Sequence, residues 1–277
     1  MASNGILNPF SDTSQYVYHY TTVDSLIKYI LPQKRLRFSR LDSTNDPEEK
    51  RWHIVSGVND TDMNDAEYIE FFKSAAYVST LIALNARVLC FSQDGKVTDI
   101  ERLSRPYCDK GFARPRMWAQ YGQNHTGVCL VFNRQKVINS FNTTFSTETH
   151  FSNSISYAPF IELISENPEA QRLDASDASK TIEQIVSEKV DKYHDMYFFS
   201  KHGDWKEEHE FRLMVKPKEN RDVFLDIDGL LECIILGARF DSCLKQPIEI
   251  LSNCFGVKPD IYSFVYNGNN YTFASDK

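Results

Sequence analysis

The chain has 277 residues, of which 42% are hydrophobic and 13% aromatic, and it carries a formal net charge of −7. These values indicate a globular protein of one large or two small domains with a sheet-containing core. The charge disfavours non-specific nucleic-acid binding by the whole surface, and no apolar run approaches the roughly 20 residues of a membrane span. No secretory signal is visible, and the six cysteines lack a Cys-x-x-Cys pair, which predicts a reduced, cytoplasmic protein.

In chain order, the first half predicts strands and helices in alternation. Residues 16–21 are aromatic and β-prone, and Thr21 or Thr22 then caps a helix whose apolar positions follow helical spacing. The turn Asn45-Asp46-Pro47 starts another helix, with the proline at its first position. Further elements are predicted as a strand over 35–40, a helix over 65–87 and a buried strand over 88–92.

The second half continues the alternation. Pro115 opens a short helix through Tyr121, and the turn Asn267-Gly268 joins a terminal hairpin. Further elements are predicted as helices over 134–141, most of 161–200 and 241–253, and as strands over 127–132, 155–157, 208–215, 231–236, 261–266 and 271–273. Since no repeat or linker interrupts this order, the sequence predicts one α+β domain over residues 16–277 after an N-terminal tail over 1–15.

The segment from Trp205 to Val215 has the most suggestive arrangement of charged side chains. As a strand, its period of two places Glu208, Glu210 and Arg212 on one face and apolar side chains on the other. Two close carboxylates repel and the arginine offsets this in part, so at least one pKa should be shifted. The same spacing also fits a solvated, ion-paired face of an antiparallel sheet.

A second candidate is a basic segment in the middle of the chain. It is interpreted either as a solvated loop or as a phosphate-facing patch for a nucleotide or nucleic acid. Its cations, opposed by Asp109 alone, are Arg102, Arg105, Lys110, Arg114 and Arg116.

Several common catalytic signatures are absent from the sequence. It contains neither common glycine-rich phosphate cradle, no His-Glu-x-x-His and no Gly-x-Ser-x-Gly. The seven histidines lack metal-ligand pairing with cysteines, so no metal is expected. The polar motifs that remain are Tyr18-His19-Tyr20-Thr21, Asn45-Asp46-Pro47, Met117 to Gly127, and Glu208 to Arg212.

In this order and spacing, the motifs resemble those of a widespread bacterial family of domain-of-unknown-function proteins. The resemblance also includes Trp205, three residues before Glu208, and the apolar run Ile234-Ile235-Leu236-Gly237, so it extends over about residues 16–240. The combination is specific for the family and not for an activity.

The opening His19-x-Thr21 and its following helix also resemble the entry to the ADP-ribosyltransferase fold. This second resemblance implies a split, mostly antiparallel mixed sheet flanked by helices, with NAD as the substrate. On the matching positions, His19 and Thr21 would hold the ribose or carboxamide and Tyr121 would stack on the nicotinamide ring. The NAD-binding residues implied in this way are His19, Tyr20, Thr21, Tyr121 and Arg212.

The same resemblance gives the two glutamates catalytic roles. Breaking the nicotinamide–ribose bond passes through an oxocarbenium-like state, which a nearby carboxylate stabilises. Glu210 would supply that carboxylate, whereas Glu208 would orient the acceptor or itself be the catalytic acid; the Glu-x-Glu pair leaves this open. Replacement of Glu210 by Gln is expected to abolish turnover and to leave the melting temperature nearly unchanged.

The leading hypothesis is therefore an NAD-dependent ADP-ribosyltransferase-like enzyme, or an NAD-cleaving relative, of bacterial defence or toxin type. Its acceptor would be nucleic acid or protein, docked by the basic segment, with no membrane partner. Three alternatives stay open: a non-catalytic module that senses a nucleotide or a phage product, a structural role, and a metal-dependent nuclease using Glu208, Glu210 and Asp46. The sequence leaves the oligomeric state open.

Overall fold

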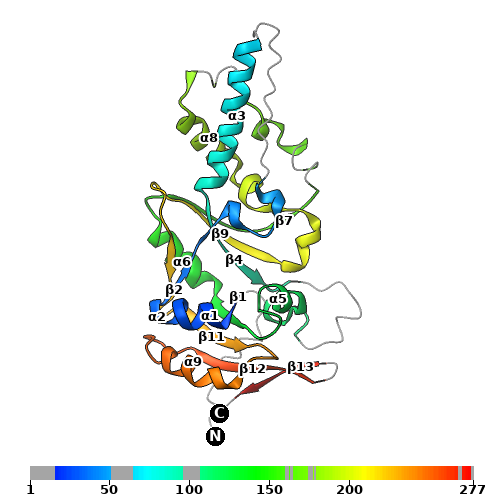
Figure 1. Ribbon diagram of the computed structural model, residues 1–277, viewed down its shortest axis with the longest axis vertical. Coiled ribbons are helices and arrows are strands. Elements are labelled where there is room, and N and C mark those ends of the chain that lie inside the picture. Colours follow the sequence, from blue (N-terminus) through cyan, green and yellow to red (C-terminus); the bar gives the residue numbers. More distant parts are fainter. Residues whose placement is uncertain are drawn as a thin grey trace.

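A nine-stranded sheet is the centre of the fold in a computed structural model of the chain (Figure 1). The structure describes residues 16–50, 65–95, 107–159, 165–173, 179–267 and 270–275, with the single positions 162 and 177. The strands of the large sheet are β1 (Tyr16–Thr21), β3 (Ser39–Arg40), β4 (Arg87–Gln93), β5 (Val128–Asn133), β6 (Thr149–Ser154), β9 (Glu210–Lys216), β11 (Leu231–Leu236), β12 (Asp260–Asn267) and β13 (Asn270–Ser275).

The strand order makes the sheet almost entirely antiparallel. Along the sheet the order is β13-β12-β11-β5-β1-β4-β9-β6, and the short β3 pairs with β4. The β11–β12 pair is parallel, whereas the other pairs of this sheet are antiparallel. Two small sheets pair β2 (Arg35–Arg37) with β10 (Phe224–Asp226) and β7 (Ser156–Tyr157) with β8 (Ser200–Lys201). The predicted α+β class with a mostly antiparallel mixed sheet is confirmed.

Helices flank the sheet and are mostly short. The α-helices are α1 (Val23–Ser25), α2 (Leu31–Gln33), α3 (Asp65–Asn85), α5 (Pro115–Gln120), α6 (Arg134–Thr144), α8 (Ile182–Phe198) and α9 (Lys245–Ser252). The 3-10 helices are η2 (Leu41–Ser43), η3 (Pro47–Lys50), η4 (Gly111–Ala113), η5 (Pro168–Gln171), η7 (Gly203–Glu208) and η8 (Ser242–Leu244), and η1 (Leu26–Ile30) is a π-helix. None of the helices in the described ranges is long and apolar enough to cross a membrane.

One face of the sheet has a continuous core. Helices η1, α6 and α9 place Leu26, Phe141 and Ile248 there, against Phe91 and Leu130 of the central strands. Burial of such side chains stabilises the fold by about 1.5–3 kcal/mol each. This face therefore holds the strands together along most of the sheet.

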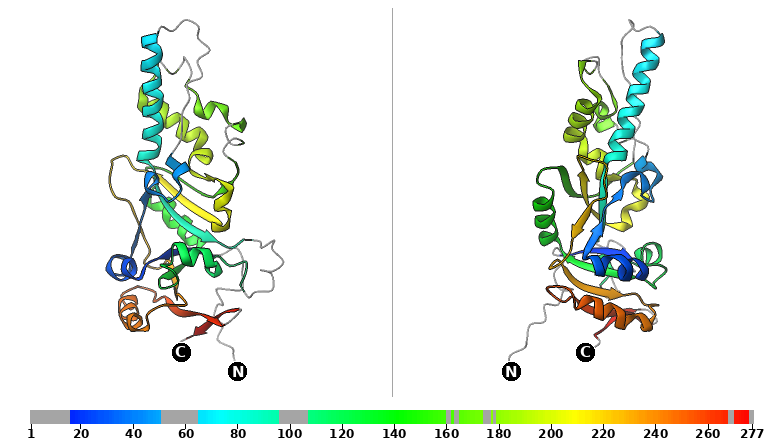
Figure 2. Two further views of the ribbon diagram at one scale, coloured as in Figure 1. Left: turned by 45° about the vertical axis from the view of Figure 1, so that its right-hand side comes forward. Right: turned by 60° about the vertical axis from the view of Figure 1, so that its left-hand side comes forward.

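The opposite face is covered by two separate cores. Trp118 of α5 packs with Tyr18 and Val131 over the β1–β5 side, whereas α3 and α8 pack over Val88 and Met214 on the β4–β9 side. Figure 2 shows α3 beside α8 at one end of the molecule and α9 with β12 at the other. The junction of β1 and β4 falls between the two cores.

The sheet is split at this junction. Strand β1 pairs with β5 at six positions, and β4 pairs with β9 at six, but β1 and β4 pair only at Val17–Gln93 and Tyr18–Ser92. Beyond Tyr18 the two strands diverge, and the His19 ring spans the gap with Nδ1 at 3.0 Å from the Cys90 carbonyl oxygen. The predicted split in the sheet is therefore present.

The segment after β1 shows how local sequence sets this geometry. Thr22 caps α1 by accepting a hydrogen bond from the Ser25 amide, as predicted. The helix then widens into a π-turn, in which the Leu31 amide bonds the Leu26 carbonyl, and it ends at Lys34 with a φ of 50°. The strand expected over 35–40 is divided into β2 and β3, which belong to different sheets.

Three sequence-based expectations differ from the structure. Between the predicted helix over 134–141 and the predicted strand over 155–157, where no element is expected, lies β6, an edge strand with half-buried side chains that carry no strong hydrophobic pattern. Within 161–200, α8 begins only at Ile182, where Thr181 and Gln184 form a capping box. Strand β9 begins at Glu210 and not at Glu208. The predicted tail over 1–15 and Gly268 of the hairpin turn lie outside the described residues.

Candidate active site

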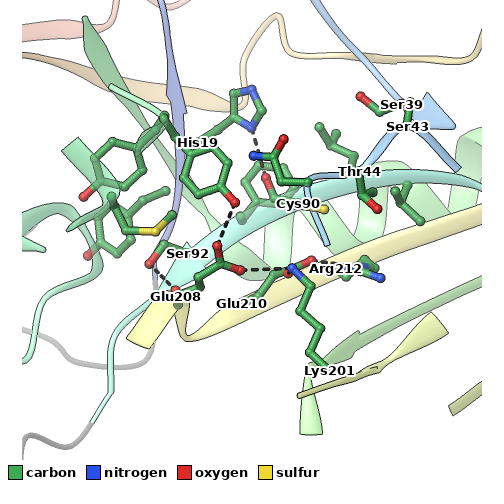
Figure 3. A pocket seen from close by; sticks show the side chains of 18 of the residues that line it. His19, Ser39, Ser43, Thr44, Cys90, Ser92, Lys201, Glu208, Glu210 and Arg212 are labelled. Atoms are coloured by element: carbon green, nitrogen blue, oxygen red, sulfur yellow. Dashed lines mark hydrogen bonds and ion pairs between the residues drawn. The ribbon is translucent and has the colours of Figure 1, made fainter. Parts of the chain in front are cut away.

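A cavity of about 330 Å³ opens at the split between β1 and β4. Its volume lies near the lower end of the range for small-molecule sites. Figure 3 shows polar side chains from β1, β4 and the β8–β9 segment turned toward this space. The polar and charged residues that line it are Tyr18, His19, Tyr20, Arg37, Ser39, Ser43, Thr44, Asn45, Ser92, Tyr121, Lys201, Glu208, Glu210 and Arg212.

The two glutamates reach the cavity by an unexpected backbone route. Glu208 is the last residue of η7, and His209 then adopts a left-handed conformation with a φ of 44° before β9 starts at Glu210. The His209 amide makes the last hydrogen bond of the 3-10 helix, to the Lys206 carbonyl, and the left-handed backbone then ends the helix. The prediction that Glu208 belongs to the strand is therefore wrong, yet both carboxylates line the same cavity.

Lys201 of β8 lies between the two carboxylates. Its Nζ is 3.0 Å from Oε2 of Glu208 and 2.7 Å from Oε2 of Glu210. The three side chains are at most 6% exposed. An ammonium group at this position offsets the repulsion that would otherwise push the carboxylates apart.

Arg212 extends the network deeper into the protein. Its Nε donates to Oε1 of Glu210 at 2.6 Å, its second nitrogen donates to the Phe198 carbonyl, and its third pairs with Glu49. The result is a continuous buried chain of charges in the order Glu208, Lys201, Glu210, Arg212 and Glu49.

This chain contains three carboxylates and two cations, so it carries one surplus negative charge when all five groups are ionised. Burial raises the pKa of Glu210, but the charges of Arg212 and Lys201 outweigh burial and lower that pKa to about 2. Burial alone would lower the pKa of Lys201, but the neighbouring carboxylates, Glu210 first, raise it. Glu210 and Lys201 therefore both stay charged at neutral pH.

A second layer of contacts orients the network. The Tyr157 hydroxyl accepts the Glu210 amide hydrogen, with 2.8 Å between oxygen and nitrogen, and Ser92 Oγ donates to the Glu208 carbonyl at 2.8 Å. The Cys90 thiol hydrogen-bonds Glu210, and burial followed by that carboxylate raises the pKa of the thiol. Cys90 also lines the cavity.

Tyr121 contacts the end of the charge network that faces the cavity. It follows α5, and its hydroxyl donates to Oε1 of Glu208 at 2.7 Å. Burial and the Glu208 charge raise the pKa of Tyr121, so its hydroxyl stays protonated and a donor. Asn45 of the Asn-Asp-Pro motif also hydrogen-bonds Tyr121, which brings two of the sequence motifs together.

The three candidate residues of β1 have different positions. His19 lines the cavity, and burial lowers its pKa, which favours the neutral ring. Tyr20 is buried, donates to the Gly111 carbonyl at 2.7 Å and packs edge-on against Trp118. Thr21 is half-buried at the end of the strand and does not line the cavity.

Gly127 of the predicted motif contacts this same strand end. A Cβ on Gly127 would lie 2.5 Å from the Thr21 carbonyl oxygen, so only glycine allows this close approach. The motif glycine thus supports the end of β1 and has no direct part in the cavity.

Two of the five cations of the basic segment are buried and do not belong to a surface patch. Lys110 is 3% exposed and pairs with Asp94, and Arg114 is 2% exposed and donates to the Gln93 carbonyl. Arg116 is exposed and lies over the Trp205 ring. Arg102 and Arg105 lie outside the described residues. The prediction that Lys110 and Arg114 belong to a docking surface is therefore wrong, because both side chains are buried and contact groups inside the protein.

The described ranges contain no group of three or more histidine, cysteine or acidic residues placed to hold a metal ion. Lys201 occupies the position between Glu208 and Glu210 where a cation shared by the two carboxylates would bind. Asp46, the third ligand of the nuclease alternative, is buried at 2% exposure and does not line the cavity. The geometry therefore disfavours a metal site built on these three residues.

Sequence reasoning missed Lys201, Glu49 and Tyr157. Glu49 follows Asn45-Asp46-Pro47 closely, and Lys201 opens the turn before Trp205, but neither has a spacing that marks it as a partner of Glu210. Glu49 and Arg212 are 163 positions apart. The need for a cation to neutralise a buried Glu-x-Glu pair is the one signal in the sequence, and it does not distinguish Lys201 from the nearer Lys206 and Arg212.

Comparisons with known proteins give one family and one structural neighbour. A family model described as "Protein of unknown function (DUF2971)" matches residues 117–213, and the predicted resemblance to a domain-of-unknown-function family is confirmed. No curated protein matches the sequence. Among solved structures, the chain is similar to DarT of Thermus sp. 2.9 in complex with NAD+, at 11% identity, with 90% of this chain and 95% of that chain covered and a TM-score of 0.35.

The burial of Glu210 predicts a large stability effect. Replacing Glu210 by Gln leaves Lys201 and Arg212 with one carboxylate fewer, and breaking a buried pair in this way costs about 3 kcal/mol or more. We expect the urea midpoint of Glu210→Gln to fall clearly below the wild-type midpoint, in place of the unchanged melting temperature expected from sequence. The matched control is Glu183→Gln, at an exposed position of α8. Equal midpoints for Glu210→Gln and wild type would contradict the network.

The low pKa of Glu210 also predicts an acid dependence of stability. Because its folded pKa is about 2 against an ordinary value of 4.5, the ionised group stabilises the fold above pH 4.5, and this is lost as the pH falls toward 2. The shift corresponds to about 3 kcal/mol. The measurement is the free energy of unfolding between pH 7 and 2, for wild type and Glu210→Gln. Parallel curves for the two proteins would exclude Glu210 as the source of the loss.

Proposed function

We propose that the cavity binds the nicotinamide–ribose end of NAD and that the protein cleaves the bond joining the two groups. The ADP-ribosyl group would then pass to water or to a nucleic-acid or protein acceptor. The observation that carries this proposal is the carboxylate charge of Glu208 and Glu210, both held at the cavity wall by Lys201.

The chemistry of the reaction explains why such a charge is useful. As the nicotinamide leaves, positive charge develops on the ribose ring, as it does in glycoside hydrolysis. A carboxylate fixed in advance in a water-poor site stabilises this charge without reorganisation. Glu208 and Glu210 are 3% and 4% exposed, so their charge is little screened by solvent.

The contacts of the two glutamates support different roles for them. Both oxygens of Glu210 accept from buried cations, Arg212 and Lys201, so its charge is largely neutralised and its position is fixed. Glu208 is the end of the charge network that faces the cavity. It shares Lys201 with Glu210, and its other partner is the neutral Tyr121 hydroxyl. We therefore assign Glu208 to the ribose and Glu210 to the positioning of Lys201.

His19 can bind the ligand in one defined form. Its Nδ1 faces the Cys90 carbonyl at 3.0 Å, so a neutral ring carries its proton on Nδ1 and leaves Nε2 as an acceptor. That acceptor suits the carboxamide N–H or a ribose hydroxyl. Tyr121 would stack on the ring, as the sequence resemblance implies, and Thr21 would contact parts of the ligand outside the cavity.

A sensing module is the second candidate, and the same contacts favour it. Each oxygen of Glu208 and Glu210 already accepts a hydrogen bond or an ion pair, which is compatible with a pocket that binds a nucleotide and performs no chemistry. The two functions differ in one product, because only cleavage releases nicotinamide.

The decisive test is nicotinamide release from labelled NAD, with and without DNA, RNA or cell lysate. We expect wild type to release nicotinamide and Glu208→Gln to lose at least about 100-fold in rate, because the charge that stabilises the oxocarbenium is removed. Glu183→Gln, exposed on α8 and outside the cavity, should match wild type.

Each outcome of this test selects one function. Release that needs one added fraction identifies a transferase and its acceptor class, whereas release with water alone identifies a hydrolase. Binding of NAD without release favours the sensor. The proposal is overturned if the protein releases no nicotinamide and NAD does not shift its melting curve.

A further inference from the structure

A second cavity, of about 540 Å³, adjoins the first. Arg37, Ser39 and Ser43 line both cavities, and the two serines appear at the edge of the site in Figure 3. We call the second cavity the arginine cleft, because four of its lining residues are arginines. The residues that line it are Arg37, Phe38, Ser39, Arg40, Ser43, Arg87, Asn220, Arg221 and Asp222.

Arg87 gives the arginine cleft a buried cation. It is 3% exposed, and its guanidinium donates to the carbonyls of Leu84 and Ala86 and to Oδ1 of Asn220. These acceptors are uncharged, and within the described ranges no carboxylate forms an ion pair with it. A buried cation without an ionic partner is costly unless an anion accompanies it.

Three further arginines line the arginine cleft: Arg37, Arg40 and Arg221. Arg40 pairs with Asp42, and Arg221 pairs with Glu148. Arg37 is exposed on β2 and pairs with Phe224 through its backbone, but its side chain makes no hydrogen bond or ion pair with any part of the chain that the structure describes. With Asp222 included, four cations stand against three carboxylates, which leaves one surplus positive charge. The charges of Asp42 and Asp222 act on Arg87 without a direct ion pair in the described residues.

We propose that the arginine cleft binds a phosphate ester whose neighbouring group lies in the first cavity. Guanidinium groups suit this task because they are permanently charged and bind phosphate oxygens in pairs. The shared residues Arg37, Ser39 and Ser43 make the two cavities neighbours, so one ligand can extend from one into the other. The link to NAD chemistry rests on the proposed function, whereas the phosphate site itself does not.

Two sources of phosphate ester fit this position. One is the pyrophosphate of NAD, whose adenosine half does not fit beside the nicotinamide half in a cavity of about 330 Å³. The other is the backbone of a single-stranded nucleic-acid acceptor. Both are bound by the same arginine chemistry, and different probes separate them.

The test replaces Arg37 by Gln and measures binding of three probes. The probes are NAD, nicotinamide riboside, which carries no phosphate, and a single-stranded oligonucleotide at several salt concentrations. Arg35→Gln is the matched control, because Arg35 is an exposed arginine of the same strand that lines neither cavity. Since the Arg37 side chain has no hydrogen-bond or ion-pair partner within the described residues, and Gln keeps the backbone pairing of β2 with β10, folding should be unaffected, which circular dichroism verifies.

We expect Arg37→Gln to weaken one phosphate probe about tenfold, the effect of losing one charge-assisted contact. Weaker NAD binding with unchanged riboside binding assigns the cleft to the pyrophosphate. Weaker oligonucleotide binding assigns the cleft to nucleic acid, provided that the slope of log K against log salt concentration also falls in magnitude by about one. Unchanged binding of both phosphate probes, or wild type binding neither, overturns the cleft proposal.

These results are separable from a failure of the proposed function. A wild-type protein that releases nicotinamide while Arg37→Gln binds both phosphate probes normally keeps the function and loses the cleft. A protein that never cleaves NAD but loses oligonucleotide affinity on Arg37→Gln keeps the cleft and loses the function.

Discussion

The ammonium group of Lys201 is the interaction on which the site depends. Glu208 and Glu210 line one small cavity at 3% and 4% exposure, and two carboxylates in such surroundings would repel or take up a proton. Lys201 prevents both, because its Nζ contacts each of them within 3.0 Å. Its strand β8 pairs with β7 and leads directly into η7, so the cation and both carboxylates are fixed by one short stretch of chain.

The split in the sheet gives this charge network access to a ligand. Continuous pairing of β1 with β4 would bring the backbones together beyond Tyr18 and close the cavity, whereas the two strands pair at only two positions. The separate cores over the two halves of the sheet, one with Trp118 and one with Met214, stabilise each side independently. The fold can therefore tolerate an opening in the middle of its sheet.

Sequence reasoning anticipated the elements with strong patterns and the residues close together in the chain. The strand at Tyr16–Thr21 and the grouping of Glu208 with Glu210 and Arg212 at one site both follow from short-range spacing. The left-handed turn at His209 does not, because no glycine or asparagine marks it. The partner Glu49 and the burial of Lys110 depend on long-range packing, which periodicity does not encode.

The two cavities together have an electrostatic polarity that neither has alone. In the first, Glu208 is the end of the charge network that faces the cavity, whereas Arg37, which lines both cavities, and Arg87 of the second make no ion pair within the described residues. A ligand with a cationic ring at one end and phosphates at the other would be oriented by this field before any close contact forms. The nicotinamide ring of NAD is a pyridinium cation joined through ribose to a pyrophosphate. If the protein binds NAD as proposed, the opposite orientation would place like charges together at both ends, so the field would favour one direction of binding.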